Sequence, residues 1–268
     1  MFRIICLLIG YAFGMIQTSY IVGKMSGIDI REHGSKNAGF TNTNRVLGIK
    51  KGVVVFVVDV VKAMLAFAAA TFIYNNFIVQ EHISFFICQE WENCLNYGTY
   101  DPFSILRTAP ACSPISGFFF AGGTFFVSSY VLPGLYAGLG AILGHCFPFY
   151  LNFKGGKGVA CALGVIIMLD WRVAIISFAT GLIVVLITRF ISLASLLITL
   201  SVPFLMFLFE YGPMSEWPIY VSDWAYFAVR SEVLWLTVIL CVFIWYLHRE
   251  NIKRLLSGTE NKFSFKKT

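Results

Sequence analysis

Three polar segments interrupt an otherwise apolar chain, and they carry the residue types that bind phosphate and transfer protons. They are residues 31–45, residues 144–158 and residues 248–262. Each combines glycine or small hydrogen-bonding residues with basic side chains. Because polar groups are costly at membrane depth, clusters of them in such a chain are the places where function is expected.

The first segment places small polar residues and two glycines between Arg31 and Arg45. Gly34 and Gly39 allow the backbone to turn and to approach a ligand closely. Arg45 has the planar guanidinium that binds phosphate through two parallel hydrogen bonds. The expected hydrogen-bond donors to an anion are Ser35, Asn37, Thr41 and Asn42. The alternative is a solvated basic loop that needs no ligand.

The second segment contains a Lys-Gly-Gly-Lys-Gly run between two apolar stretches. Backbone N–H groups at a helix N-terminus, flanked by lysines, make an anion site. The run is not a nucleotide-hydrolysing P-loop, because Lys157 is followed by Gly158 and not by Ser or Thr. A tight basic turn without a ligand is the alternative, and His145 fits either a packing or a catalytic role. The candidate ligands are Lys154, Gly155, Gly156, Lys157 and Gly158.

The third segment continues the last apolar stretch as an amphipathic helix. His248 and Asn251 are three residues apart, so they share a helix face. Glu250 and Arg254 are four apart, and we expect them to pair. The alternative is a basic C-terminal helix that only anchors the chain at the membrane surface.

Smaller features have structural explanations as well. Asp59 and Lys62, at i and i+3 in an apolar stretch, are expected to neutralise each other. Ser192 is either a helix cap or a ligand contact. The seven cysteines show no metal-ligand spacing. Cys6, Cys146, Cys161 and Cys241 are expected to be packing residues, and a disulfide is open to Cys88, Cys94 and Cys112.

The composition requires a membrane setting for these segments. Of the 268 residues 58% are hydrophobic, 13% are charged, and the mean hydropathy is +0.76. This excludes an ordinary soluble domain and a disordered chain, and a net charge of +6 gives no reason to expect nucleic-acid binding. A span needs about 20 apolar residues. We predict an all-α polytopic bundle of about seven spans, over residues 2–22, 52–74, 133–153, 158–169, 173–188, 191–209 and 233–247.

Orientation follows from the lysines and arginines, which are concentrated in residues 24–51 and 249–268. The positive-inside rule places these segments in the cytoplasm, the C-terminus with them and the N-terminus outside. The three polar segments then share the cytoplasmic face. Residues 75–132 become an excursion on the outer face, and the apolar residues 113–132 within it are predicted not to span.

The three segments together resemble the bacterial acyl-phosphate:glycerol-3-phosphate acyltransferases. The motifs are similar over Gly34 to Arg45, over Gly144 to Ala160 and over His248 to Glu260. The Asp59-x-x-Lys62 step and the residues from Arg189 to Ser195 are also similar. Departures are Lys36, Phe40, Cys161 and residues 75–132, which look like an insertion.

The resemblance implies a single integral-membrane domain over residues 1–268, with its site at the cytoplasmic face of the cell membrane. It implies transfer of a fatty acyl group from acyl-phosphate to the 1-hydroxyl of sn-glycerol 3-phosphate. The products would be lysophosphatidic acid and phosphate, opening phospholipid synthesis. No cofactor, metal, acyl-CoA or nucleic acid is implied. Membrane lipid and an enzyme that supplies acyl-phosphate would be its partners.

The chemistry of the polar residues fits this reaction and suggests a role for each. His248 would take the hydroxyl proton, unless a phosphate oxygen does so and His248 only contacts phosphate. Asn251 or loop N–H groups would meet the developing oxyanion. Ser35 would be a hydrogen-bonding residue in direct transfer, or the carrier of an acyl group. Arg45 completes the catalytic set, and Ser192 and Glu250 join the substrate-binding set.

Two other functions stay open at this point. A transporter or scramblase-like protein would also have several spans and basic loops, but would place polar features near the midplane and often in paired repeats. The polar segments here lie at one interface, and the sequence has no visible repeat. A related acyltransferase with another phosphate acceptor is the second alternative.

Overall fold

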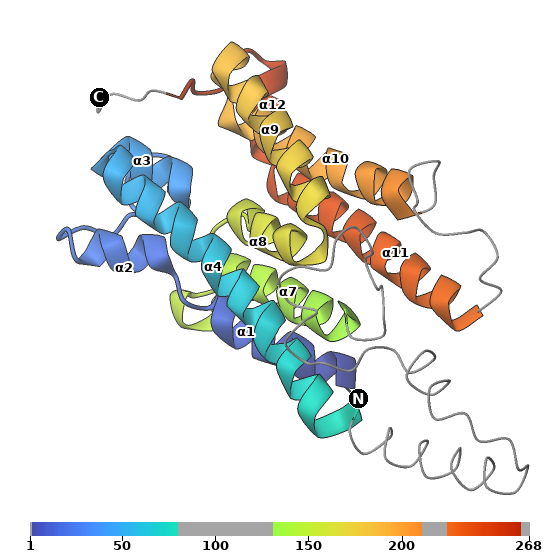
Figure 1. The fold of residues 1–268 in the computed structure, drawn as a ribbon. Coiled ribbons are helices and arrows are strands. Elements are labelled where there is room, and N and C mark those ends of the chain that lie inside the picture. The colour runs from blue at the N-terminus through green and yellow to red at the C-terminus, as the bar shows by residue number, and fades with distance from the viewer. Residues whose placement is uncertain (1, 80–130, 211–223, 264–268) are drawn as a thin grey trace, which may run out of the picture.

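The computed structural model describes residues 2–79, 131–210 and 224–263, and in this part of the chain the structure is helices and loops without a β-strand (Figure 1). The expectations for Cys88, Cys94 and Cys112, and for residues 113–132 up to residue 130, lie outside the described residues. The helices are α1 (Phe2–Gly14), α2 (Thr18–Lys24), α3 (Phe40–Leu47), α4 (Ile49–Ile73), α7 (Val131–Cys146), α8 (Val159–Leu169), α9 (Trp171–Thr188), α10 (Ile191–Glu210), α11 (Trp224–Leu247) and α12 (Arg249–Leu256). A π-helical turn covers Tyr74–Val79 and a 3-10 turn covers Phe149–Leu151.

The long apolar runs of the sequence form the membrane-spanning helices. In the described part, five segments are long and apolar enough to cross a bilayer: Phe2–Lys24, Ile49–Ile73, Val131–Leu151, Trp171–Thr188 and Ile191–Phe209. A sixth is the bent pair Ser231–Leu247 and Arg249–Leu256, which meet at 62°. α8 is apolar but has only 11 residues. The prediction of an all-α membrane bundle is therefore confirmed, while the count of about seven and the orientation stay predictions.

Small residues let α1 and α7 pack with their backbones in contact. Gly10 of α1 lies against the main chain of Ala137, and Gly140 of α7 lies against the main chain of Leu7. A Cβ atom at either glycine would overlap a backbone oxygen of the facing helix. Such close approach through small residues is a usual way for membrane helices to associate, since lipid removes the hydrophobic drive between them.

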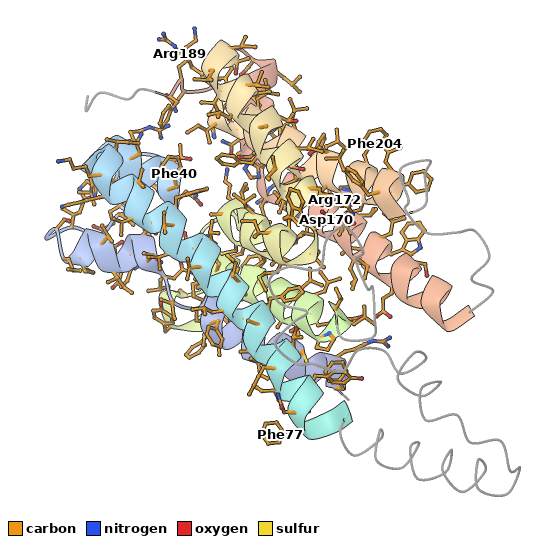
Figure 2. The ribbon with its side chains drawn as sticks, in the orientation of Figure 1. Phe40, Phe77, Asp170, Arg172, Arg189 and Phe204 are labelled. Carbon is orange, nitrogen blue, oxygen red and sulfur yellow. The ribbon has the colours of Figure 1, made fainter. Side chains whose placement is uncertain are left out.

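Charged contacts also fasten the end of the bundle where α1 begins. Glu232 of α11 pairs with Arg3 of α1 at 2.7 Å and accepts a hydrogen bond from the Tyr136 hydroxyl of α7 at 2.5 Å. At the start of α9, Asp170 is fully buried and accepts a hydrogen bond from the Arg172 N–H at 2.7 Å, capping the helix (Figure 2). These contacts are at helix ends opposite to those that carry the three polar segments.

The four cysteines of the described residues are buried and free, as expected of packing residues. Cys146 and Cys161 belong to the main core cluster, which is formed by α4, α7, α8, α9, α10 and α11. This core holds the helix ends that present the polar segments.

Candidate functional site

The three polar segments meet at one end of the bundle, where Figure 1 shows α3 and α12. Lys157 of the second segment donates a hydrogen bond from Nζ to Oδ1 of Asn251 in the third. A Cβ atom on Gly156 would lie 2.7 Å from the carbonyl oxygen of Ala38, so the first and second segments are in contact there. Lys157 and Asn251 are 94 residues apart in the sequence. The three segments, although distant along the chain, therefore form one polar region.

Asn42 organises the first segment. It is fully buried, and its Oδ1 accepts a hydrogen bond from the backbone N–H of Ser35 at 2.8 Å. Its amide nitrogen donates to the carbonyl oxygens of Ile30 and His33, at 2.9 and 3.0 Å. Gly34 has a φ of +59°, which fits a turn where only glycine avoids strain. The polar atoms of Asn42 are therefore used to shape the loop, which presents the exposed Ser35 side chain.

Arg45 lies in the last turn of α3 and is half-buried. In the part of the chain that the structure describes, its guanidinium makes no ion pair and no side-chain hydrogen bond, so it is available to an anion. Asn37 and Thr41 are half-buried beside the start of the same helix. Phe40 packs its ring against Phe56 and Phe263, with centroids 5.8 and 6.2 Å away (Figure 2).

The glycine-rich run of the second segment is held by the end of α7. The N–H groups of Gly155 and Gly156 donate to the carbonyl oxygens of Cys146 and His145, at 3.1 and 3.0 Å. Gly158 precedes α8 with a φ of +78°, and no side chain caps that helix. The first N–H groups of α8 have no partner within the helix, whereas those of Gly155 and Gly156 are committed to the fold. Lys154 is exposed and Lys157 is half-buried.

Glu260 is the residue whose importance the sequence did not reveal. Its side chain is 8% exposed, and its two oxygens accept three hydrogen bonds. The donors are Ser192 at 2.6 Å, Asn251 at 2.9 Å and Arg254 at 2.7 Å. It follows a turn at Gly258, where the chain leaves the helical register. Helical spacing therefore does not predict its contacts with Asn251 and Arg254. In the sequence, only its place at the end of the third motif singles it out.

Glu250 does not join this cluster. It pairs with Lys253 at 3.2 Å, and its side chain is 58% exposed. Arg254 instead pairs with Glu260, at 2.7 Å. The expected Glu250–Arg254 pair is therefore wrong, because Glu260 offers Arg254 a less exposed carboxylate than Glu250 does.

His248 lies at the bend between α11 and α12 and is buried. Its Nδ1 is 2.8 Å from the carbonyl oxygen of Ile244. A carbonyl only accepts, so Nδ1 carries the hydrogen and Nε2 has a free lone pair. Burial, together with the nearby Lys157, lowers the pKa of His248 to about 4, so that the ring is neutral at pH 7.

Burial also sets the charge state of Lys157. Burial first, and then the neighbouring Arg254, lower the pKa of Lys157 to about 8. Burial alone would raise the pKa of Glu260, but the hydrogen bonds from Ser192, Arg254 and Asn251 outweigh it and lower that pKa below its ordinary value. At neutral pH the site therefore combines a largely charged Lys157 with an ionised Glu260.

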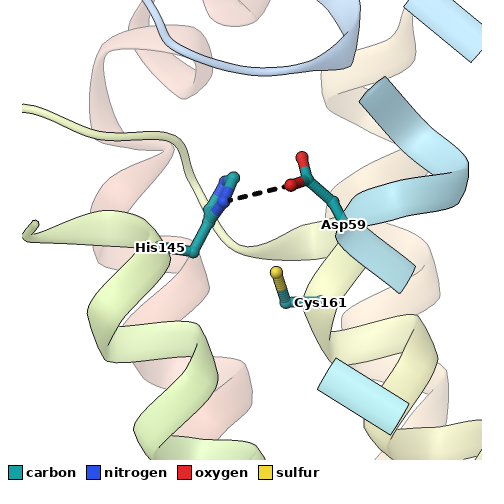
Figure 3. Close-up of side chains that lie close together, drawn as sticks. All are labelled: Asp59, His145 and Cys161. Atoms are coloured by element: carbon teal, nitrogen blue, oxygen red, sulfur yellow. Dashed lines mark ion pairs between the residues drawn. The ribbon is translucent and has the colours of Figure 1, made fainter. Parts of the chain in front are cut away.

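A second buried polar cluster lies next to the glycine-rich run. Figure 3 shows three of its residues, Asp59, His145 and Cys161, and marks the 3.6 Å contact between His145 Nδ1 and Asp59. Lys62 donates from Nζ to Asp59 at 2.7 Å, to His145 Nδ1 at 2.9 Å and to the carbonyl oxygen of Ile16 at 2.7 Å. The expected neutralisation of Asp59 by Lys62 is confirmed. Asp59, His145 and Cys161 have metal-ligating atoms within 4.8 Å of one another. The Lys62 ammonium already binds two of these three, which makes it the cation of the cluster.

Comparison with known proteins identifies close relatives over nearly the whole chain. A sequence model of the glycerol-3-phosphate acyltransferase family matches residues 4–93 and 105–258. The glycerol-3-phosphate acyltransferase of Chlorobaculum tepidum is 32% identical over 266 residues, which are 97% of this chain and 95% of that protein. The enzyme of that name from Aquifex aeolicus is 32% identical over 253 residues, which cover 94% of this chain and 95% of the relative.

Solved structures give the same result. The crystal structure of PlsY, an integral membrane glycerol 3-phosphate acyltransferase, in its glycerol 3-phosphate form is similar with a TM-score of 0.65 and 29% identity. That match covers 98% of this chain and 96% of the other. The lysophosphatidic acid form of PlsY gives a TM-score of 0.64 at 28% identity, with the same coverage.

Proposed function

The chain belongs to the glycerol-3-phosphate acyltransferase family, and we propose that it transfers a fatty acyl group from an acyl-phosphate to the 1-hydroxyl of sn-glycerol 3-phosphate. The products are lysophosphatidic acid and phosphate, so that the reaction is the first acylation of phospholipid biosynthesis. The observation that carries the proposal is the contact between Lys157 and Asn251, which joins the glycine-rich run to the helix after the last span. The acceptor and product are those named for the two forms of the similar structure.

Both substrates carry phosphate, so a site that holds them together must offset their repulsion. Arg45, Lys157 and the uncapped N-terminus of α8 supply positive charge and N–H donors for this. Lys154 adds an exposed cation at the edge. Fixing the two reactants in contact removes the entropy cost of a bimolecular encounter, which can contribute about 7–11 kcal/mol to catalysis.

The chemistry needs no cofactor, because an acyl-phosphate is already an activated mixed anhydride. The hydroxyl oxygen of the acceptor attacks the acyl carbonyl carbon, and the carbon–oxygen bond to phosphate breaks. Phosphate leaves with the electron pair of that bond. The hydroxyl proton goes to the free Nε2 of His248 or to a phosphate oxygen, and the second amide hydrogen of Asn251 is available to the oxyanion.

We favour direct transfer over an acyl-enzyme. The Ser35 side chain is exposed, and within the described residues its hydroxyl has no hydrogen bond to a histidine, lysine or carboxylate. A serine nucleophile needs such a base. Complete loss of activity in Ser35→Ala, combined with an acyl adduct trapped by Ser35→Cys, would overturn direct transfer.

The setting of the reaction is part of the proposal. The distribution of lysine and arginine supports a multi-pass protein of about seven spans in the cell membrane, with the N-terminus outside and the site on the cytoplasmic face. Residues 1–268 form one domain with residues 75–132 as an outer-face insertion. An enzyme that produces acyl-phosphate would supply the donor from the same face.

The direct test is acyl transfer by purified protein in detergent. Glycerol 3-phosphate is supplied with palmitoyl-phosphate and, in parallel, with palmitoyl-CoA. Lysophosphatidic acid from the first donor alone supports the proposal, and product from palmitoyl-CoA alone contradicts the donor. Absence of product with either donor, from protein shown to be folded, overturns the function. Arg45→Ala and Lys36→Ala form a matched pair, since both remove a basic residue of one segment but only the former is placed in the site.

A further inference from the structure

A buried ammonium lies near the middle of α4 and outside the chemistry described so far. Lys62 is 3% exposed and Asp59 is 1% exposed, in a span that runs from Ile49 to Ile73. Ionised side chains at this depth are expensive and are kept where they have a role. All three N–H donors of Lys62 are used, by Asp59, by His145 and by the carbonyl oxygen of Ile16.

These contacts join three elements that surround the polar region. Ile16 lies at the break between α1 and α2, and Thr18 at the start of α2 donates to Asp59 at 3.1 Å. Asp59 and Lys62 belong to α4, and His145 is in the last turn of α7. The cluster is therefore built at the point where these helices approach the glycine-rich run.

His145 connects the cluster to that run. Its carbonyl oxygen accepts hydrogen bonds from Gln17 at 2.7 Å and from the Gly156 N–H at 3.0 Å. Its Nε2 faces Gly156 so closely that a Cβ atom there would overlap it. The same Cβ position is 2.7 Å from the carbonyl oxygen of Ala38. Gly156 is thus packed between the ring of His145 and the main chain of the first segment.

The orientation of that ring depends on Lys62. An ammonium can only donate, so the Nδ1 of His145 accepts from it and the ring hydrogen is on Nε2. Nδ1 also lies 3.6 Å from an oxygen of Asp59, so the removal of both Lys62 and Asp59 would leave this side of the ring without a polar partner. Lys157 is the next residue in the run, so any displacement of Gly156 moves its ammonium.

We propose that Lys62 and Asp59 act, through the ring of His145, as positioning residues that fix the glycine-rich run and with it the phosphate-binding ammonium of Lys157. They touch no substrate. The proposal rests on the proposed function for its kinetic readout, and it has a second readout that does not depend on that function.

The variants separate positioning from simple charge burial. Lys62→Met alone leaves Asp59 buried without its cation and is expected to impair folding. Asp59→Leu with Lys62→Met removes both charges with side chains of similar size, and it leaves Nδ1 of His145 without either of its polar neighbours. His145→Asn places an amide oxygen near the position of Nδ1, where Lys62 can bond it. His145→Gln places its amide near the position of Nε2 and leaves Lys62 without that acceptor.

The expected kinetic result is a raised KM for glycerol 3-phosphate with a smaller change in kcat. Because a displacement on the order of 1 Å can cost about 100-fold, the double variant should show at least a tenfold rise in KM. His145→Asn should lie closer to the unmodified protein than His145→Gln. Glu232→Gln, which removes the charge that binds Arg3 and Tyr136 at the other end of α7, is the matched control and should leave KM unchanged. A folded double variant with an unchanged KM would overturn the proposal.

Limited trypsin digestion measures how firmly the glycine-rich run is held, without depending on activity. Cleavage after Lys154 and Lys157 is measured in detergent relative to cleavage after Lys262, in the C-terminal segment. The double variant should be cut faster in the run but not at Lys262. If the unmodified protein shows no acyl transfer, the proposed function fails while faster cleavage still supports positioning. Equal cleavage rates in the double variant and the unmodified protein would overturn positioning whatever the activity.

Discussion

At the scale of single residues, Lys157 has to meet two opposed conditions. Its contact with Asn251 requires partial burial, which lowers its pKa to about 8. Its proposed role requires the charged form. The margin between this pKa and neutral pH is narrow, so the charge of Lys157 should be visible in the pH dependence of the enzyme.

We predict that kcat/KM for glycerol 3-phosphate falls as pH rises through about 8. Lys157 is protonated below its pKa of about 8 and neutral above it, so phosphate binding is strong on the acid side and is lost on the alkaline side. Lys157→Arg should abolish this fall, since arginine stays charged. Lys157→Ala should lower kcat/KM by about 10- to 150-fold, as expected for a charged hydrogen bond worth about 1.5–3 kcal/mol. An alkaline fall that persists in Lys157→Arg would contradict the assignment.

Glu260 gives a prediction about stability. Glu260→Gln leaves the donors from Ser192, Asn251 and Arg254 facing an uncharged amide, and should lower the free energy of unfolding by on the order of 2 kcal/mol. The pKa of Glu260 is lowered in the fold, so its contribution is present above the ordinary glutamate pKa and is lost as pH falls through the folded value. Thermal unfolding in detergent measures both effects. The exposed Glu250→Gln is the control, and an equal loss in both variants would argue against a special role for Glu260.

At the scale of elements, the close approach of α1 and α7 is the most demanding contact. Gly10→Val should prevent it, because the new side chain meets the main chain of Ala137, which has no room to move. Ala12→Val, on the exposed side of the same helix, adds volume toward lipid and should be tolerated. The yield of monodisperse protein after detergent extraction distinguishes the two. Equal yields would mean that α1 and α7 do not pack through glycine.

The sequence predicts these helices well and their interruptions less well. Apolar runs of about 20 residues have few other structures available in a bilayer, so the spans follow from composition. The break between α1 and α2 does not follow from composition, because a single polar residue such as Gln17 is compatible with an unbroken apolar span. It is stabilised by a tertiary hydrogen bond from Gln17 to the carbonyl oxygen of His145, 128 residues away. Likewise, the N–H groups of Gly155 and Gly156 donate to carbonyl oxygens at the end of α7. The local Lys-Gly-Gly-Lys-Gly motif does not predict these hydrogen bonds.

At the scale of the whole molecule, the meeting of the three polar segments was predicted by alternating spans and basic loops. The contacts between Lys157 and Asn251 and between Gly156 and Ala38 confirm that meeting. The family inferred from the segments is confirmed by the family model and by relatives at 32% identity. The site roles assigned to individual residues stay predictions.

The orientation makes a prediction for the whole chain. Green fluorescent protein fused after Thr268 should fluoresce, and alkaline phosphatase fused there should be inactive, if the positive-inside rule keeps the basic C-terminal segment in the cytoplasm as predicted. The same pair of reporters fused before Met1, behind an export signal for the phosphatase, should give the reverse result. Fluorescence from green fluorescent protein at both ends would contradict the predicted topology.

The 62° bend between α11 and α12 bears on how the substrates are supplied. Under the proposed function, His248 and Asn251 stand at a phase boundary, with solvent on one side and acyl chains on the other. Glycerol 3-phosphate partitions into water and the acyl donor into the bilayer, so neither has to change phase before they react. The donor concentration that sets the rate is then its mole fraction in the bilayer and not its concentration in water. The product leaves the site by lateral diffusion in the same bilayer.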